Sequence, residues 1–430
     1  MKKKNWVEVI SQVLMSLLVA SSVSAQSSAP NVSSSSADES VLSQAIQAAL
    51  DRAPQIDADR KLIDANKLEV LAIQRDRWNP QIRAQASAGW HEGASVIDGV
   101  VVGQPATAGL SVALPLYDGE QRHRQALLAD THTQDAVLRW KETKVQISTR
   151  IRQLLWSSRA TRAYIESLKP WLEPTLQLRV QASRLQEQRV ITQAMLAQTQ
   201  AVDASLRHTY STAVEELNLQ TQEWQALTGS IFPATAFSGT SWPALASTPP
   251  WLDQLTSNHA LLRAENSIAT RNSEMELRKT ENSLQIQLRA QAFRDSDNQQ
   301  RSFLGVLISK PLFDNGVRDA QLGAAQARVD AARSQLAAAK QSQLRESRFY
   351  RTELSRLRDL DGLIQQELNA NVGKLERTSL LWANQKVELG EMLGAVTSTQ
   401  HTLERRYATH KQFWSHYAQA SLLLAPTDLP

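Results

Sequence analysis

Apolar and polar residues alternate in four short stretches of this sequence, as they do in β-strands with one apolar and one polar face. Apolar residues occupy every second position from Ile82 to Trp90, from Ala108 to Leu114, from Leu284 to Ala292 and from Leu304 to Ile308. We therefore expect two β-hairpins, over 80–115 around a Gly-rich loop and over 284–311, with strands of about ten residues. Both a membrane β-barrel with a wet lumen and a half-buried sheet of a soluble protein produce this alternation.

Long segments with helical periodicity follow each predicted hairpin. The segment from Gly119 to Gln188 holds about 70 residues and could extend roughly 105 Å as one straight helix. The corresponding segment of the second half contains a heptad seam, in which residues are spaced by three and four. Its members are Leu322, Ala325, Val329, Ala332, Leu336 and Ala339.

These segments predict two long helical hairpins, over 119–228 and 317–424. The chain should reverse near Gln188 and near Gln385, with return helices at about 191–227 and 388–424.

Prolines predict where helices are interrupted. Pro170 and Pro174 each remove a helix hydrogen bond and should kink or restart the first long helix. A shorter helical pattern over 41–77 should end at Asn79-Pro80, because proline disfavours helix in the residue before it.

The two halves of the chain repeat one another. Gln81-Ile82-Arg83-Ala84-Gln85-Ala86 returns as Gln287-Leu288-Arg289-Ala290-Gln291-Ala292, and Pro115-Leu116-Tyr117-Asp118-Gly119 returns as Pro311-Leu312-Phe313-Asp314-Asn315-Gly316, with one residue inserted before the glycine. We expect a tandem duplication, with a first repeat over 41–230, a proline-rich linker over 231–251 and a second repeat over 252–425.

The N-terminal segment 1–25 has the pattern of a secretory signal peptide. A basic start precedes an apolar stretch from Val13 to Ala20, and small residues lie before the expected cleavage site. An N-terminal membrane anchor is the alternative, although the apolar stretch is short for one. The segment 26–40 would then form a flexible, Ser-rich leader.

Composition adds mainly exclusions. The chain has no cysteine, which excludes disulfides, thiolate metal sites and a lipid-modified cysteine. Its net charge is +4, to which Lys2, Lys3, Lys4 and Glu8 of the predicted signal peptide contribute +2, and this gives no electrostatic case for nucleic acid. The eight histidines lack metal-ligand spacing, and no nucleophile–base set or Gly-rich phosphate loop is present. We therefore predict no catalytic, cofactor-binding or metal-binding residue and no enzymatic activity.

The number of predicted strands has a consequence for assembly. Four strands per chain are too few to close a barrel, and an open sheet edge in lipid leaves backbone groups without hydrogen bonds. If the strands cross a membrane, several chains must share one barrel, and three chains would supply twelve strands.

Several short motifs follow one another along the chain in a characteristic order and spacing. They are Leu42-x-x-Ala45-Ile46-x-x-Ala49-Leu50 with Ala53-Pro54-x-Ile56, then Pro80 and the strand after it, then Pro115-Leu116-Tyr117-Asp118-Gly119, and the duplicated unit itself. Together they resemble the TolC family of outer-membrane channel proteins. The resemblance implies a mainly α-helical fold with a small membrane β-barrel contribution: a homotrimer that shares a twelve-stranded barrel in outer-membrane lipid and a periplasmic tunnel of helices. It further implies a passive exit duct for efflux or type I secretion, which works with a periplasmic adaptor and an inner-membrane transporter, either ABC or proton-driven.

The resemblance also points to residues at the helical tips. Those similar in position to the adaptor-contacting tips are Gln188, Arg189, Val190, Ile191, Thr192, Gln385, Lys386, Val387 and Glu388. Gln188 and Gln385 stand where the family often has glycine. Glu391 matches an acidic position of the periplasmic aperture, whereas Ala194 and Gly394 stand where further acidic residues are expected. The alternative for the tips is a polar turn, and for Glu391 an ordinary solvated charge.

Two other classes of protein share some of these features. A periplasmic adaptor also contains long helical hairpins, but it should insert a hairpin into Gly- and Val-rich lipoyl-like and small barrel domains. A filamentous coiled-coil protein would not need alternating strands at matching places in both repeats.

Overall fold

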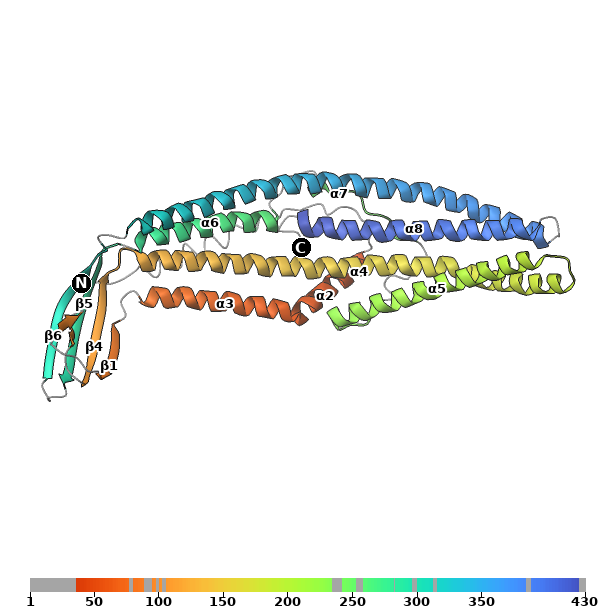
Figure 1. Cartoon of the computed structure of the whole chain (residues 1–430). Helices are drawn as coiled ribbons and strands as arrows, with labels where there is room; N and C mark the ends of the chain where they lie inside the picture. Colours follow the sequence, from red (N-terminus) through yellow and green to blue (C-terminus); the bar gives the residue numbers. More distant parts are fainter. Residues whose placement is uncertain are drawn as a thin grey trace.

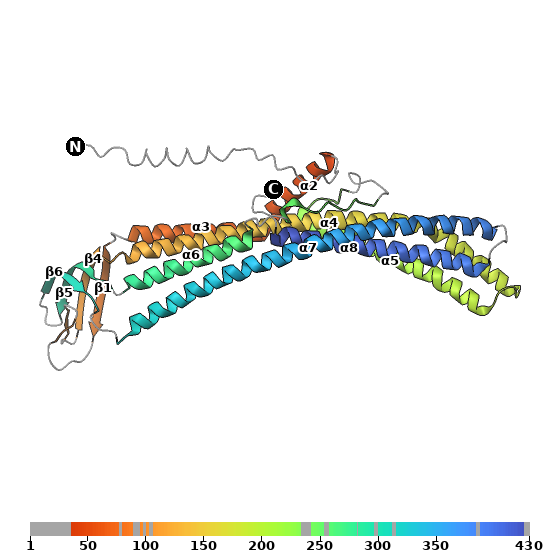
Figure 2. The same ribbon diagram turned by 90° about the horizontal axis from the view of Figure 1, so that it is seen from above.

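The computed structural model describes residues 36–76, 80–88, 95–97, 100–102, 106–233, 242–252, 258–281, 283–295, 300–311, 315–383 and 388–424. These residues build a long, narrow molecule with a β-sheet at one end and the far ends of two helical hairpins at the other (Figure 1). The view from above shows the same arrangement, with the helices running side by side between the two ends (Figure 2). Among the described residues, no helix combines the length and the apolar character that a membrane crossing needs.

The N-terminal helical region is divided in two. Helix α2 spans Ser36–Arg52 and helix α3 spans Pro54–Arg75, so the prediction of one helix over 41–77 is wrong. The cause is Pro54, which occupies the first turn of α3 and follows Ala53 in an extended conformation. The prediction of a flexible leader over 26–40 is also wrong for its last residues, because 36–40 are helical. The predicted signal peptide and the rest of the leader lie outside the described residues.

The predicted strands form one antiparallel sheet. It contains β1 (Gln81–Ala88), β4 (Ala106–Tyr117), β5 (Gln285–Asp295) and β6 (Gln300–Ser309) in the order β1-β4-β5-β6. Both predicted hairpins are confirmed as β1–β4 and β5–β6 pairs. The β4–β5 pair joins the two repeats, which the sequence pattern did not indicate.

A second, smaller hairpin was not expected. Strands β2 (Ser95–Ile97) and β3 (Val100–Val102) pair within the segment predicted as a Gly-rich loop. Trp90, predicted at a strand end, lies outside the described residues.

The two long helical hairpins are confirmed almost to the residue. The first consists of α4 (Gln121–Glu187) and α5 (Gln193–Thr228), and the second of α7 (Val317–Ala383) and α8 (Leu389–Leu424). The outgoing helix has 67 residues and the return helix 36 in both repeats. Such matching lengths support the predicted duplication.

Helix α4 continues through its two prolines. Pro170 and Pro174 lie inside one uninterrupted helix, so the predicted restart does not occur. Both prolines are on the exposed side, where water can hydrate the carbonyls that lose a hydrogen bond. The buried Leu168 and Thr175, on either side of them, hold the helix against its neighbours.

The heptad seam of α7 is confirmed. Ala325, Val329 and Ala332 are buried in an otherwise exposed part of α7, which packs along α6 (His259–Thr280). Their small side chains allow the two helices to approach closely.

Backbone conformation revises the sequence alignment of the two repeats. Gly119 and Glu120 have positive φ, as do Asn315 and Gly316. Each left-handed pair directly precedes a long helix, α4 in the first repeat and α7 in the second, so the residue expected to be inserted before the glycine is not an insertion. Gly119 is required by a close approach, since a Cβ there would lie 1.6 Å from Ser283 Oγ.

The linker between the repeats packs on the middle of the helical bundle. Its described part, 231–233 and 242–249, has no regular structure, as predicted, and ends in the short helix η2 (Pro250–Leu252). Ala246 is buried in an apolar cluster with Phe413 and Trp414. The Trp414 ring stacks on Trp156 at a centroid distance of 4.9 Å, so these two tryptophans pack the helices together.

Candidate functional site

The four-stranded sheet has one apolar and one polar face. Pairing places the apolar residues of neighbouring strands opposite one another, as in Ala84 with Leu110 and Leu288 with Val306. The apolar face is exposed: Ile82 is 70%, Leu304 75% and Ile308 63% accessible. On the polar face Ser111 and Gln291 are buried. An extended apolar surface of this kind marks a face that contacts lipid or another protein.

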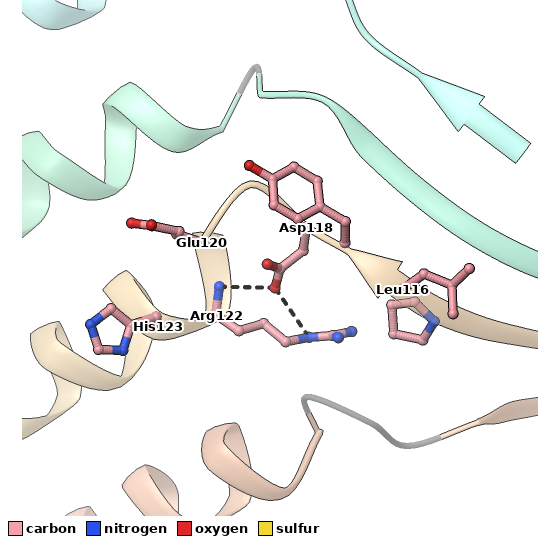
Figure 3. A pocket seen from close by; sticks show the side chains of 7 residues that line it. Leu116, Asp118, Glu120, Arg122 and His123 are labelled. Atoms are coloured by element: carbon pink, nitrogen blue, oxygen red, sulfur yellow. Dashed lines mark hydrogen bonds and ion pairs between the residues drawn. The ribbon is translucent and has the colours of Figure 1, made fainter.

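The junction between sheet and helices is fixed by Arg122. Asp118 follows β4, and one of its carboxylate oxygens accepts from the Arg122 backbone N–H at 3.2 Å (Figure 3). The Arg122 side chain also lies 3.2 Å from Asp76, which directly follows α3. Arg122 thereby ties the start of α4 to the end of α3, beside a shallow pocket of about 340 Å³ between strand and helix.

The second repeat has a comparable tie. Arg318 is the second residue of α7, as Arg122 is of α4, and its guanidinium donates to the Lys279 carbonyl oxygen at 3.4 Å. Lys279 is in the last turn of α6, as Asp76 is at the end of α3. In both repeats, therefore, an arginine at the start of the long helix contacts the end of the short helix.

The turn between α4 and α5 has a well-defined hydrogen-bond pattern. Val190 N–H donates to the Leu185 carbonyl and Arg189 N–H to the Gln186 carbonyl, each at 2.8 Å, which is a Schellman motif. Arg189 is the left-handed residue, with φ 59°, whereas Gln188 has φ −79°. The left-handed conformation, which favours glycine, is therefore adopted by Arg189, the residue that follows Gln188.

The remaining residues of the first tip differ in exposure. Val190 is 66% accessible and Ile191 is half-buried. The Thr192 hydroxyl caps α5 by accepting from the Met195 N–H at 3.2 Å. The first tip therefore presents Arg189 and Val190 outward on a rigid turn.

The second tip is described in part. Gln385, Lys386 and Val387 lie outside the described residues, so their predicted role has no structural account. Glu388 is exposed, and its carbonyl accepts from the Glu391 N–H at 3.1 Å at the start of α8.

The predicted aperture residue Glu391 lies in the first turn of α8, with its side chain exposed. A carboxylate at this end of a helix is stabilised by the helix dipole. Ala194 in α5 and Gly394 in α8 are exposed as well. Because neither residue is ionisable, neither adds to the charge of Glu391.

The two tips share one apolar cluster. Leu196 of α5 packs with Leu389, Met392 and Leu393 of α8, and Met195 packs on this cluster. The described tip residues of both repeats therefore lie side by side at the end of the molecule farthest from the sheet (Figures 1 and 2).

Polar contacts join the two hairpins above this cluster. Gln400 of α8 donates to Ser205 Oγ of α5 at 3.1 Å, and Lys411 lies 2.6 Å from Glu216. Between these two contacts along α8, the Tyr407 hydroxyl is hydrogen-bonded to the Thr161 hydroxyl of α4 at 2.9 Å. These contacts leave no signal in the sequence, because the partners in each pair belong to different repeats.

A buried charge cluster in the second hairpin is likewise not apparent from the sequence. Asp361 Oδ1 of α7 lies 3.0 Å from Arg406 Nε and 3.0 Å from His410 Nε2, both on α8. Trp242 of the linker covers the cluster, with its ring 4.7 Å from the Arg406 guanidinium and 4.9 Å from the His410 ring. Burial opposes ionisation of Asp361, but His410 and Arg406 outweigh it and keep the pKa of this carboxyl below its ordinary value.

No site for chemistry emerges from the described residues. They contain no group of three or more His, Asp or Glu side chains that could hold a metal ion. The geometry consists of an amphipathic sheet, a long helical bundle and a pair of tips.

Comparison with known proteins identifies the fold. No family model and no curated protein sequence matches the chain. Solved structures do. The outer membrane protein VceC of Vibrio cholerae superposes with a TM-score of 0.70 at 17% identity, over 90% of this chain and 97% of VceC. The outer membrane channel CmeC of Campylobacter jejuni superposes with a TM-score of 0.69 at 11% identity, over 90% of this chain and 87% of CmeC.

The open state of the outer membrane channel MtrE of Neisseria gonorrhoeae gives a TM-score of 0.67 at 14% identity, over 90% of this chain and 89% of MtrE. Each of the three matches covers 90% of this chain. This chain has the fold of the TolC family of outer-membrane channels.

Proposed function

We propose that this chain is one subunit of a homotrimeric outer-membrane channel that acts as the exit duct of an efflux or type I secretion system. The observation that carries the proposal is the sheet. Among the described residues, its outermost strands β1 and β6 each pair on one side only, and the sheet exposes a continuous apolar face. Three such sheets joined edge to edge supply twelve strands, with the apolar faces toward lipid and the polar faces toward a lumen.

The helical hairpins support the periplasmic part of the proposal. A helix of 67 residues is roughly 100 Å long and carries the tips far from the membrane. The exposed residues of the first tip, together with Glu388, are available there to a periplasmic adaptor, and Gln385, Lys386 and Val387 are proposed to act with them. The energy for export would come from an ABC or proton-driven transporter in the inner membrane.

Membrane fractionation tests the assembly directly. The full-length protein, expressed in a Gram-negative host, should be found in the outer membrane. It should run as a trimer in unheated detergent gels and as a monomer after boiling. A soluble periplasmic monomer would rule out the shared barrel and favour the adaptor or coiled-coil alternative.

Glu391 is expected to act at the periplasmic aperture, where three copies would attract cations. Replacing Glu391 by Ala should weaken the block of single-channel current by divalent and trivalent cations added on the periplasmic side. Glu173→Ala serves as the control, because this carboxylate is exposed on α4 away from the tip. Identical block in wild type and Glu391→Ala, at every cation tested, would remove Glu391 from the aperture.

A further inference from the structure

The strands of the sheet carry an unbalanced positive charge. Those that the structure describes contain four arginines, Arg83, Arg289, Arg294 and Arg301, and one acidic residue, Asp295. Asp295 is the last residue of β5, so the interior of the sheet has arginines and no carboxylate.

Strand register places two of these arginines in successive rows across the sheet. Two rows of paired residues on the polar side are Gln81–Ala113–Arg289–Gly305 and Arg83–Ser111–Gln291–Phe303. Each of the two rows contains one arginine, Arg289 on β5 and Arg83 on β1. Neighbouring rows are two residues apart, which is about 7 Å along a strand.

Glutamine side chains hold two of these arginines. Arg83 is exposed and donates to the Gln81 side-chain oxygen at 2.8 Å. Arg289 lies 2.7 Å from the Gln291 side-chain oxygen when that amide is oriented to accept. A neutral amide does not cancel the charge of a guanidinium, and these contacts keep both side chains on the polar face.

Space for these side chains comes from the small residues beside them. The central strand β4 offers Gly109, Ser111 and Ala113 on the polar face. Gly305 of β6, opposite Arg289, is covered by the Phe303 ring, since a Cβ there would lie 2.5 Å from that ring. The guanidinium groups of Arg83 and Arg289 therefore lie on a surface to which β4 adds no bulky side chain.

We infer that the barrel lumen is an anion-selective filter, in which Arg83 and Arg289 from three subunits attract anionic solutes and exclude cations. This inference rests on the proposed function, because the rows become rings only when the sheets close into a barrel. Rings of basic side chains select anions in pores, and their field reaches about 10 Å at moderate salt. Rows about 7 Å apart therefore act together. The cargo suited to this lumen carries carboxylate, phosphate or sulfate groups.

Reversal potentials across a KCl gradient test the inference in planar bilayers containing the purified full-length trimer. The Glu391 ring at the aperture is the same in all of these channels, so the change in the permeability ratio between variants reports on the lumen. The double variant Arg83→Gln, Arg289→Gln should lower the chloride-to-potassium permeability ratio at least roughly threefold, because it removes both rings. Arg294→Gln is the matched control: Arg294 alternates to the opposite face, near the end of β5, and should leave the ratio unchanged.

The outcomes separate the inference from the proposed function. A conducting trimer whose ratio is the same in wild type and double variant overturns the anion filter and leaves the channel intact. A protein that forms no heat-sensitive trimer and no pore overturns both. If the double variant fails to assemble, Arg83→Gln alone is measured, since Arg83 is exposed on the outermost strand, and it should shift the ratio in the same direction. No shift in that variant also overturns the filter.

Discussion

Replacing Leu304 by Arg is expected to abolish assembly in the outer membrane. Leu304 lies in the middle of β6 on the exposed apolar face and is 75% accessible. An arginine facing lipid near the bilayer midplane costs about 2–4 kcal/mol, and three subunits bring the total to roughly 6–12 kcal/mol. A cost of ~2 kcal/mol alone shifts an equilibrium roughly thirtyfold. Quantifying the heat-sensitive trimer in outer-membrane fractions measures the effect.

The matched control places the same charge on the other face. Gln287 lies on β5, and Gln287→Arg puts the new guanidinium on the polar side of the sheet, where it stays hydrated. This variant should assemble to nearly the wild-type level. Equal assembly of both variants would show that the apolar face does not contact lipid.

Replacing Asp361 by Ala is expected to destabilise the helical part by about 3–5 kcal/mol. The Asp361 side chain is 17% and that of Arg406 10% accessible, so this is a largely buried ion pair. Removing one partner leaves the other charge buried without compensation. The free-energy cost of that unpaired charge is much larger than the net stabilisation that the intact pair provided. The midpoint of thermal unfolding of the detergent-solubilised trimer, followed by circular dichroism, should fall clearly.

A surface pair on the same helix provides the control. Asp330 and Arg333 of α7 lie 3.2 Å apart, but both side chains are more than half exposed. Solvent screens such pairs, so Asp330→Ala should leave the midpoint unchanged within error. A midpoint that falls equally in both variants would mean that burial of Asp361 is not what makes its contacts important.

The contribution of Asp361 to the stability of the folded protein should also depend on pH. Its pKa in the folded protein is lowered from the ordinary value of 3.8, so folding favours the ionised form. The stability that this ionisation contributes is present above pH 3.8 and is lost as pH falls through the lowered pKa. The difference in the midpoint of thermal unfolding between wild type and Asp361→Ala should therefore become smaller in acid. A difference that stays constant as pH falls below 3.8 would contradict this.

Features set by local periodicity could be predicted from the sequence. The alternation from Leu304 to Ile308 places side chains on opposite faces whatever the strand pairs with. The seam through Ala325 and Val329 likewise depends only on residue spacing along one helix. Both helical hairpins were consequently placed within a few residues of their observed bounds.

Features that depend on how elements meet could not be predicted. Asp361 and His410 are 49 residues apart, and their contact depends on how α7 and α8 are rotated about their axes. The β4–β5 pair and the covering of Arg406 by Trp242 arise from the way the repeats and the linker pack together. The left-handed conformation of Arg189 could not be predicted for a different reason. A residue other than glycine gives no signal in the sequence for that conformation.

The order of the strands makes the proposed ring a head-to-tail assembly. Each subunit would present the free side of β1 to the free side of β6 in the next, so closure needs an intact pair at every seam. One copy with a damaged β6 would interrupt the whole circle. When intact and damaged genes are expressed equally and mix at random, only about one ring in eight would contain three sound copies. A damaged gene copy would therefore be dominant over an intact one, although most strands in the mixed rings are intact.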